Sequence, residues 1–173
     1  MVDEIGTERL RLRRWRIADA PALKAVLDAN VEHLKLWIPW RVAAPGELED
    51  IEERCAAWSM DFDAGRSFIW AIWTLKGELL GGVGIYPRDA KGRVDLPLAD
   101  RAEVGYWLKA DMTGKGYATE AARAAVEVAK GLPRVKRIEM RCDPKNAASI
   151  AVPKRLGFTE GHEGDDVVLT LEL

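Results

Sequence analysis

Residues 105–122, GYWLKADMTGKGYATEAA, form the segment of this sequence with the most chemical content. A strand-like run leads into a turn with Gly114 and Gly116, and an alanine-rich helix is predicted to begin directly after it. The first backbone N–H groups of a helix have no partner within it and lie at the positive end of its dipole. Because the glycines permit close approach and Lys115 adds positive charge, the pattern predicts a site for a phosphate-bearing ligand.

Two well-known phosphate loops fit this segment poorly. A Walker loop is excluded, because Lys115 is followed by Gly116 and not by Ser or Thr. The dinucleotide fingerprint would place a third glycine where Thr119 stands. The unit that carries that fingerprint also usually comes first in its fold, and not after about 100 residues. From spacing alone, a plain glycine-rich connection that binds no ligand stays open as an alternative.

Asn146 and Ser149 form a second candidate pair, at the start of a helix predicted over 146–157. Side chains three residues apart on a helix lie on the same face, so both can point at the same spot. Asn146 also fits an ordinary helix N-cap, which would accept a hydrogen bond from the amide near Ser149. The pair therefore belongs either to a binding site or simply to a helix end.

The elements that must position these residues are read from the spacing of the apolar side chains. Strands are predicted where apolar residues alternate or form β-branched and aromatic runs, and helices where they recur every three or four residues. The predicted strands cover 9–13, 68–74, 78–86, 102–108, 135–142 and 167–173. One predicted helix begins after Asp19, and the others cover 34–37, 48–62, 117–130 and 146–157.

The resulting order, β-α-α-α-β-β-β-α-β-α-β, is typical of an α+β fold. It predicts a mixed, mostly antiparallel sheet flanked by helices, with one parallel βαβ crossover that carries the glycine loop. The sequence contains no internal repeat and no low-complexity linker. We therefore expect residues 1–173 to form a single domain.

Charge and cysteine content exclude several classes of protein. Twenty-six basic and 28 acidic residues give a net charge of −2, which argues against electrostatic capture of nucleic acid or of an anionic membrane. Cys55 and Cys142 lack the spacing of a metal site or a disulfide framework, so we expect no metal. No apolar run approaches the roughly 20 residues of a membrane span. These features favour a cytoplasmic location.

Taken together, the segments resemble the GNAT acetyltransferases, and within them the RimJ/RimL-like branch that acetylates protein N-termini. The order and spacing of five motifs carry the resemblance, which covers essentially the whole chain. The motifs are TERLRLRRW, LKLWIPW, AEVGYWL, GKGYATEAA and DPKNAAS…RLGF. The resemblance implies a GNAT fold and an enzyme that transfers the acetyl group of acetyl-CoA to a primary amine, without a metal. A homodimer is common in this branch.

The resemblance also assigns roles to individual positions. The strand backbone at Trp107 and Leu108 would pair with the pantetheine arm, the glycine loop would wrap the pyrophosphate, and Ser149 would protonate the departing thiolate. Trp37 and Trp40 would line the acceptor side of the cleft. The residues that would hold acetyl-CoA are Trp107, Leu108, Gly114, Lys115, Gly116, Tyr117, Ala118, Thr119 and Asn146.

Three features depart from the family pattern. Asp111 stands where an Arg or Gln usually opens the phosphate loop. Pro153 lies inside the helix after Asn146, where it removes the N–H that would bond the Ser149 carbonyl; we expect it to kink or open that helix. The segment after Phe158 is shorter than in RimL-like chains, where it carries a glutamate proposed as the general base, so that role cannot be transferred.

Acetyl transfer needs a neutral amine, a polarised thioester carbonyl and a stable leaving thiolate. An α-amine with a pKa near 8 is roughly one tenth neutral at pH 7, so a strong base is less essential for it than for lysine. Glu103, on the strand that leads to the loop, is our candidate for the base, acting through water. Further candidates are Glu160, His162, Glu163 and Asp165.

The acceptor stays open between two classes of amine. A protein N-terminal α-amine is the favoured acceptor, and a small molecule such as an aminoglycoside, a polyamine or an amino-acid-like toxin is the alternative. A module that binds acyl-CoA without catalysis would also keep the glycine loop, but Asn146 and Ser149 together favour catalysis.

Overall fold

The computed structural model describes residues 1–39 and 44–173. Nine strands in this part of the chain form one sheet, in the order β1-β2-β3-β4-β6-β7-β9-β8, with β5 paired to β4. The strands are β1 (Glu4–Gly6), β2 (Leu10–Arg14), β3 (Phe68–Thr74), β4 (Leu79–Asp89), β5 (Gly92–Arg93), β6 (Arg101–Leu108), β7 (Arg137–Cys142), β8 (Thr159–Glu163) and β9 (Asp166–Glu172). The β6–β7 pair is parallel and the other pairs of this sheet are antiparallel, which confirms the predicted fold class.

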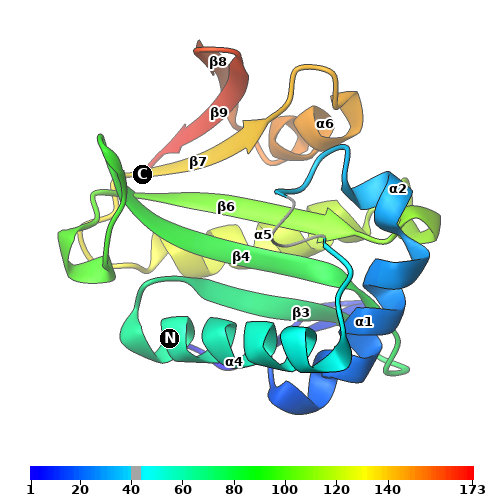
Figure 1. Ribbon diagram of the computed structural model, residues 1–173. Helices are drawn as coiled ribbons and strands as arrows, with labels where there is room; N and C mark the ends of the chain where they lie inside the picture. Colours follow the sequence, from blue (N-terminus) through cyan, green and yellow to red (C-terminus); the bar gives the residue numbers. More distant parts are fainter. Residues whose placement is uncertain (40–43) are drawn as a thin grey trace.

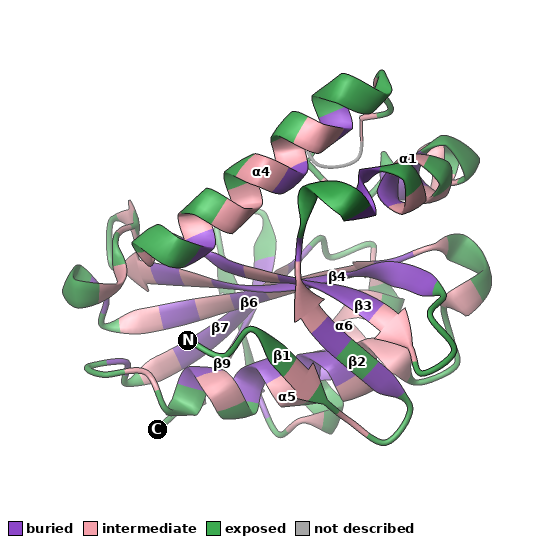
Figure 2. Cartoon of the chain, turned by 90° about the horizontal axis from the view of Figure 1, so that it is seen from below, coloured by how far each residue is buried: buried purple, intermediate pink, exposed green. Residues whose placement is uncertain are grey.

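Helices cover both faces of the sheet (Figures 1 and 2). The helices are α1 (Ala20–Ala29), α2 (Val31–Leu34), α4 (Leu48–Ala64), α5 (Tyr117–Lys130) and α6 (Ala147–Arg155). Helices α1 and α4 lie on one face, where Leu23, Leu27 and Ile51 are buried with Trp15 against the sheet. Helix α5 lies on the other face and buries a stripe of alanines, whose small side chains let the helix approach the strands closely.

The apolar periodicity predicted the long elements and missed the short ones. Strands β1 and β5 contain three and two residues, too few to show any alternation. Every residue of β8 is exposed, so this edge strand has no apolar face that a sequence pattern could reveal. The segment predicted as a helix over 34–37 folds as α2 followed by a turn.

The sheet splits between its two parallel strands. Strand β6 pairs with β4 along its whole length, from Arg101 to Leu108. The register of β6 with β7 covers three residues, from Arg101 opposite Arg137 to Glu103 opposite Glu139. Beyond them, β7 stays paired with β9 and diverges from β6, and α6 lies above the opening (Figure 1). One edge of β6 after Glu103 is therefore left without a strand partner in the described part of the sheet.

Gly81 of β4 lies opposite Leu108, at the end of β6. A Cβ atom at Gly81 would lie 2.0 Å from the carbonyl oxygen of Trp107 and 2.9 Å from the Cα of Leu108. Both are backbone atoms of β6, so they cannot move aside as a flexible side chain could. Glycine at this position is required by the pairing that holds β6 in place.

Replacing Gly81 with alanine should lower the free energy of unfolding by about 3 kcal/mol, because the added methyl group overlaps a paired strand. Chemical denaturation of the two proteins measures the difference. Gly6→Ala is the matched control, because no atom lies within 4 Å of a Cβ built there, and it should change stability by less than about 0.5 kcal/mol. Equal stabilities for the two variants would contradict the packing argument.

Candidate functional site

The glycine loop has the geometry of an anion site. A short 3-10 helix (Ala110–Met112) follows β6. The chain then enters α5 through Gly116, whose φ of +82° lies in the left-handed region. Side chains other than glycine adopt that conformation rarely. The helix begins at Tyr117, so the N–H groups of residues 117–119 have no acceptor inside α5. These amides are available to an anion.

Arg9 fixes the conformation of this loop from the start of the chain. Its guanidinium donates a hydrogen bond to the carbonyl oxygen of Lys115 (3.1 Å), pairs with Glu120 of α5 (2.7 Å) and lies over the ring of Tyr117. Glu120 also accepts a hydrogen bond from Thr7 (2.6 Å). Arg9 and Glu120 lie in the motifs TERLRLRRW and GKGYATEAA, but the sequence analysis gave them no role, because they are 111 residues apart and nothing local shows that they pair.

Glu120 holds this clamp in its charged form. Partial burial raises the pKa of Glu120, but the hydrogen bonds from Thr7 and Arg9 outweigh that effect and leave the pKa below its usual value. A depressed carboxyl pKa means that the contact is present at neutral pH and is lost only as the pH falls through that pKa. The loop is therefore clamped throughout the neutral range.

A cavity of about 1120 Å³ extends from the glycine loop to the opening between β6 and β7. Of the predicted site residues, those that line it are Trp37, Trp107, Leu108, Gly114, Gly116, Ala118, Thr119, Asn146 and Ser149. Lys115 and Tyr117 are not among the lining residues; the Lys115 amine lies against the Met112 sulfur and the Tyr117 ring lies beneath Arg9. Basic side chains also line this cavity, at Arg9, Arg123, Lys145 and Arg155.

Asp111, where the family pattern has a basic or amide side chain, is not among the lining residues either. Its carboxylate lies 3.6 Å from the amine of Lys109. Lys109 is also paired with Glu78 at 2.6 Å. The negative charge of Asp111 is thus matched by a neighbouring cation.

The start of α6 brings Asn146 and Ser149 together. The side-chain oxygen of Asn146 accepts a hydrogen bond from the Ser149 backbone N–H (3.0 Å), so the N-cap interpretation is correct. The same two residues line the cavity, so the cap also fixes their positions in the site. The two interpretations of this pair are compatible.

Pro153 lies inside α6 without opening it, so the expected opening does not occur, and the expected kink stays a prediction. The helix runs without a break from Ala147 to Arg155. The Ser149 carbonyl, which has no N–H donor at position 153, instead accepts a hydrogen bond from the Tyr106 hydroxyl at 2.9 Å. A side chain from β6 thus replaces the missing helical hydrogen bond.

A second cavity, of about 790 Å³, lies on the face of the sheet covered by α4. Aromatic side chains line it at Trp58, Tyr86 and Trp107. Among the described residues, both cavities are bordered by Trp37, Ile38, Tyr106, Trp107, Asn146 and Ser149. The two cavities therefore meet at the opening between β6 and β7. Trp40, the other aromatic residue predicted for this wall, lies outside the described residues.

Glu103 lines the second cavity, as a base would have to, but arginines surround it. Its carboxylate forms an ion pair with Arg88 and lies 3.9 Å from Arg93 and 3.8 Å from Arg141. Glu139, its register partner on β7, is buried between Arg101 and Arg141. The two glutamates thus belong to one network of charges at the closed end of the opening.

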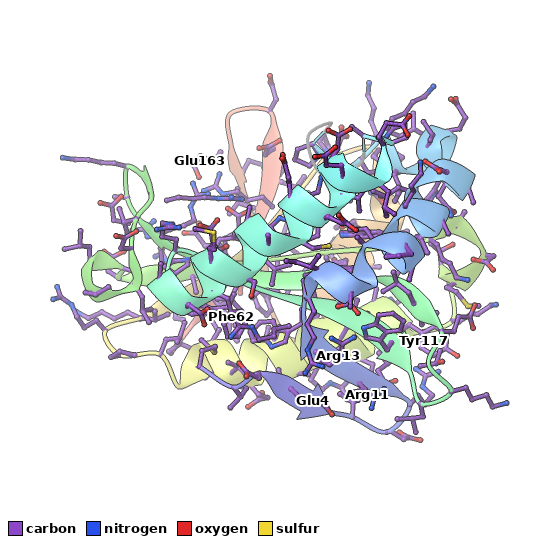
Figure 3. The ribbon with its side chains drawn as sticks, turned by 60° about the horizontal axis from the view of Figure 1, so that its bottom comes forward. Glu4, Arg11, Arg13, Phe62, Tyr117 and Glu163 are labelled. Atoms are coloured by element: carbon purple, nitrogen blue, oxygen red, sulfur yellow. The ribbon has the colours of Figure 1, made fainter. Side chains whose placement is uncertain are left out.

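Two of the four candidate bases near the C-terminus are held in ion pairs. Lys154 pairs with Glu160, and Arg141 pairs with Glu163 near the tip of the β8–β9 hairpin (Figure 3), and each cation lowers the pKa of its partner. None of Glu160, His162, Glu163 and Asp165 is among the residues that line either cavity. Asp166, which the sequence analysis did not single out, does line the second cavity.

Cys142 lies at the end of β7, where its sulfur is 3.4 Å from the Ser149 hydroxyl oxygen. Burial raises the pKa of its thiol, which stays neutral at physiological pH. Cys142 is thus a neutral neighbour of Ser149 and not an activated nucleophile.

Residues 1–39 and 44–173 contain neither a metal-binding cluster nor a membrane-spanning helix. In that part of the chain, no group of three or more His, Cys, Asp or Glu side chains could hold a metal ion. No helix there is long and apolar enough to cross a bilayer.

Two solved structures with a similar fold contain CoA-type ligands. RimL, a ribosomal L7/L12 α-N-protein acetyltransferase in complex with coenzyme A, superposes with a TM-score of 0.82 over 98% of each chain, at 20% identity. The microcin C7 self-immunity acetyltransferase MccE, in complex with acetyl-CoA and AMP, has a TM-score of 0.80 at 20% identity, over 96% of this chain and 94% of MccE. At these identities the likeness establishes the fold.

The sequence comparisons identify the family directly. YdaF of Bacillus subtilis strain 168, named provisionally as a ribosomal N-acetyltransferase, is 26% identical over 160 residues, which cover 92% of this chain and 82% of YdaF. The model of the acetyltransferase (GNAT) domain matches residues 9–159. Its fold and this match agree with the motifs found in the sequence, and the chain belongs to the GNAT family of acetyl-CoA-dependent N-acetyltransferases.

Proposed function

We propose that this enzyme acetylates the α-amine of a protein or peptide N-terminus. The observation that carries the proposal is the meeting of two cavities at the opening between β6 and β7, with Ser149 bordering both. Acetyl-CoA enters through the cavity that ends at the glycine loop. The acceptor amine enters through the cavity beneath α4, and the thioester lies between them.

Acetyl-CoA is held by backbone groups more than by side chains. The amides at the start of α5 bind the pyrophosphate, which the positive end of the helix favours. The unpaired edge of β6 near Trp107 and Leu108 pairs with the pantetheine arm, as an additional strand would. Asn146 binds the pantetheine or carbonyl region. The basic residues that line this cavity match the charge of the phosphates.

The acetyl transfer needs only modest acid and base assistance from side chains. The amine nitrogen attacks the thioester carbonyl carbon, the carbon–sulfur bond breaks, and the amine loses one proton. Ser149 donates a hydrogen bond or a proton to the departing thiolate, and Glu103 or a water beside it accepts the amine proton. A thiolate whose conjugate acid has a pKa near 8.5 is already an adequate leaving group, so the contribution of Ser149 is modest.

The charges around the acceptor cavity favour a single α-amine over a polycation. In the described part of the chain, three arginines and four acidic residues line it: Arg54, Arg93, Arg141, Asp61, Glu103, Asp143 and Asp166. Two of these carboxylates are already paired, Asp61 with Arg66 and Glu103 with Arg88. A polyamine or an aminoglycoside carries several charges that would need free carboxylates. The RimL likeness, to a protein described as an α-N-acetyltransferase, supports the same acceptor class.

The acceptor class can be tested with acetyl-CoA and three sets of amines. These are peptides with free N-termini, the same peptides with blocked N-termini and one lysine, and spermidine with kanamycin as small polycations. We expect free CoA thiol and acetylated product only with the first set. Product from spermidine or kanamycin alone would contradict the proposal, and no turnover with any set would favour a module that only binds acyl-CoA.

Ser149→Ala should lower kcat by up to about 100-fold and leave the acetyl-CoA affinity unchanged.

Replacing Gly116 with valine should weaken CoA binding by tenfold or more in a calorimetric titration. A β-branched residue at φ +82° is strained, and its Cβ would lie 3.3 Å from the Arg9 guanidinium that clamps the loop. Gly77→Val is the matched control, because Gly77 has a similar φ of +84° in a hairpin turn that lines neither cavity. Both variants should lose stability, and only the first should lose affinity. An unchanged affinity in Gly116→Val would refute the pyrophosphate placement.

Glu103→Gln should slow turnover at pH 7 and recover as the pH rises towards 8. The reason is that an α-amine with a pKa near 8 then loses its proton without help, whereas a lysine acceptor would need about two pH units more. Glu139→Gln is the control, because Glu139 shares Arg141 with Glu103 and is not among the residues lining the acceptor cavity. It should lower stability by about 1–3 kcal/mol without changing the pH profile of kcat. If both variants have the same pH profile, Glu103 is part of the charge network and not the base, and Asp166→Asn is the next variant to measure.

A further inference from the structure

The hydrogen bonds around Ser149 are unusual for a helix. An α-helical carbonyl normally accepts the N–H of the residue four positions later, and for Ser149 that residue is Pro153, which has none. Helix α6 continues through Pro153 to Arg155, although this acceptor has lost its helical partner. The Ser149 carbonyl therefore depends on a donor from outside the helix.

Tyr106 supplies that donor from the opposite side of the opening. Its hydroxyl donates to the Ser149 carbonyl oxygen at 2.9 Å and lies 3.3 Å from the Ser149 hydroxyl oxygen. A phenol has a single proton. Because that proton is used on the carbonyl, the phenol oxygen accepts the second hydrogen bond, from the Ser149 hydroxyl. One side chain thus contacts both the backbone and the side chain of Ser149.

The surroundings keep this arrangement neutral. Burial raises the pKa of Tyr106 well above its usual value, so the phenol keeps its proton at any physiological pH. Among the described residues, the other side chain in contact with the Ser149 hydroxyl is that of Cys142, whose thiol is also neutral. The Ser149 hydroxyl is therefore oriented by hydrogen bonds alone.

We propose that Tyr106 is a positioning residue that holds Ser149 for catalysis, and that Pro153 creates the need for it. This inference rests on the proposed function, in which Ser149 meets the leaving thiolate. The Ser149 hydroxyl rests against the Tyr106 oxygen, and it turns to the sulfur when negative charge develops there. Tyr106 stays bonded to the Ser149 carbonyl during that turn, so the hydroxyl moves without any movement of α6.

The arrangement also connects the two sides of the opening. Tyr106 belongs to β6 and Ser149 to α6, so their contact fixes the distance between the strand edge that faces the pantetheine arm and the helix that carries the hydroxyl. A shift of about 1 Å between reacting groups can cost up to about 100-fold in rate. Losing the contact should thus lower kcat while leaving the phosphate-binding loop intact.

The test is a double-mutant cycle between Tyr106→Phe and Pro153→Ala, with acetyl-CoA and the free-N-terminus peptide that the unmodified protein acetylates fastest. Tyr106→Phe should lower kcat by between about 10-fold and 100-fold, with KM for acetyl-CoA unchanged within about twofold. Its melting temperature should fall by about 2–4 °C. Pro153→Ala restores an N–H opposite the Ser149 carbonyl, so adding it to Tyr106→Phe should recover the melting temperature and part of kcat.

Pro21→Ala is the matched proline control, because Pro21 lies in the first turn of α1, where a missing N–H breaks no helical bond. In the Tyr106→Phe background it should rescue neither quantity. Full activity of Tyr106→Phe, or a Pro153→Ala effect that is the same with and without the Tyr106 hydroxyl, would overturn the inference.

Two further outcomes separate this inference from the proposed function. If Ser149→Ala is fully active while Tyr106→Phe is impaired, Tyr106 acts independently of Ser149, and the inference fails while N-terminal acetylation stands. If the unmodified protein turns over no amine, the proposed function fails, and the thermal cycle alone decides whether Tyr106 replaces the Pro153 hydrogen bond. Non-additive melting temperatures then support the structural part of the inference, and additive ones refute it.

Discussion

The early end of the pairing between β6 and β7 is the constraint on which the rest of this structure depends. Strand β6 is held along its whole length by β4, and β7 is held along its whole length by β9. Each strand thus has a complete partner on its outer side, and the two separate after Glu103 and Glu139. The strand pairing on both sides holds the opening, and the unpaired edge of β6 is preorganised for an extended molecule.

The opening between β6 and β7 forms a passage that connects the two faces of the sheet. Side chains alternate across a strand, so Tyr106 points to the side of α5 and α6, while Glu103 and Trp107 point to the side of α4. One cavity lies on each side, and the two share Ser149 and Asn146 of α6 as well as Trp37. Helix α6 is packed over the passage and tied to β6 through the hydroxyl of Tyr106. A donor and an acceptor can thus approach from opposite faces and meet at one point.

The charges follow the same division. The cavity that ends at the glycine loop has amides at the start of α5 without a helical acceptor, which suits a phosphate-bearing ligand. In the described residues it is lined by Arg9, Arg123, Lys145 and Arg155 and also by Glu8, Glu120 and Glu127. At the closed end of the passage, Glu103 and Glu139 lie among Arg88, Arg101 and Arg141, and each glutamate is compensated within the protein. Buried carboxylates of this kind are tolerable only when they are paired.

The sequence alone determined the parts of this protein that local rules govern. Apolar periodicity predicted the long strands and helices, and the glycines after β6 predicted the loop that leads into α5, because a helix start is defined by a few consecutive residues. Asn146 was predicted as a helix N-cap for the same reason. The tertiary structure alone decided that Arg9 clamps the loop from 106 residues away, that Tyr106 completes the hydrogen bonds of a helix 43 residues later, and that Glu103 is enclosed by arginines. Those contacts join strands and helices that are distant in sequence, and a hydrogen bond between them leaves no periodic or local trace, since its geometry exists only once the sheet has assembled.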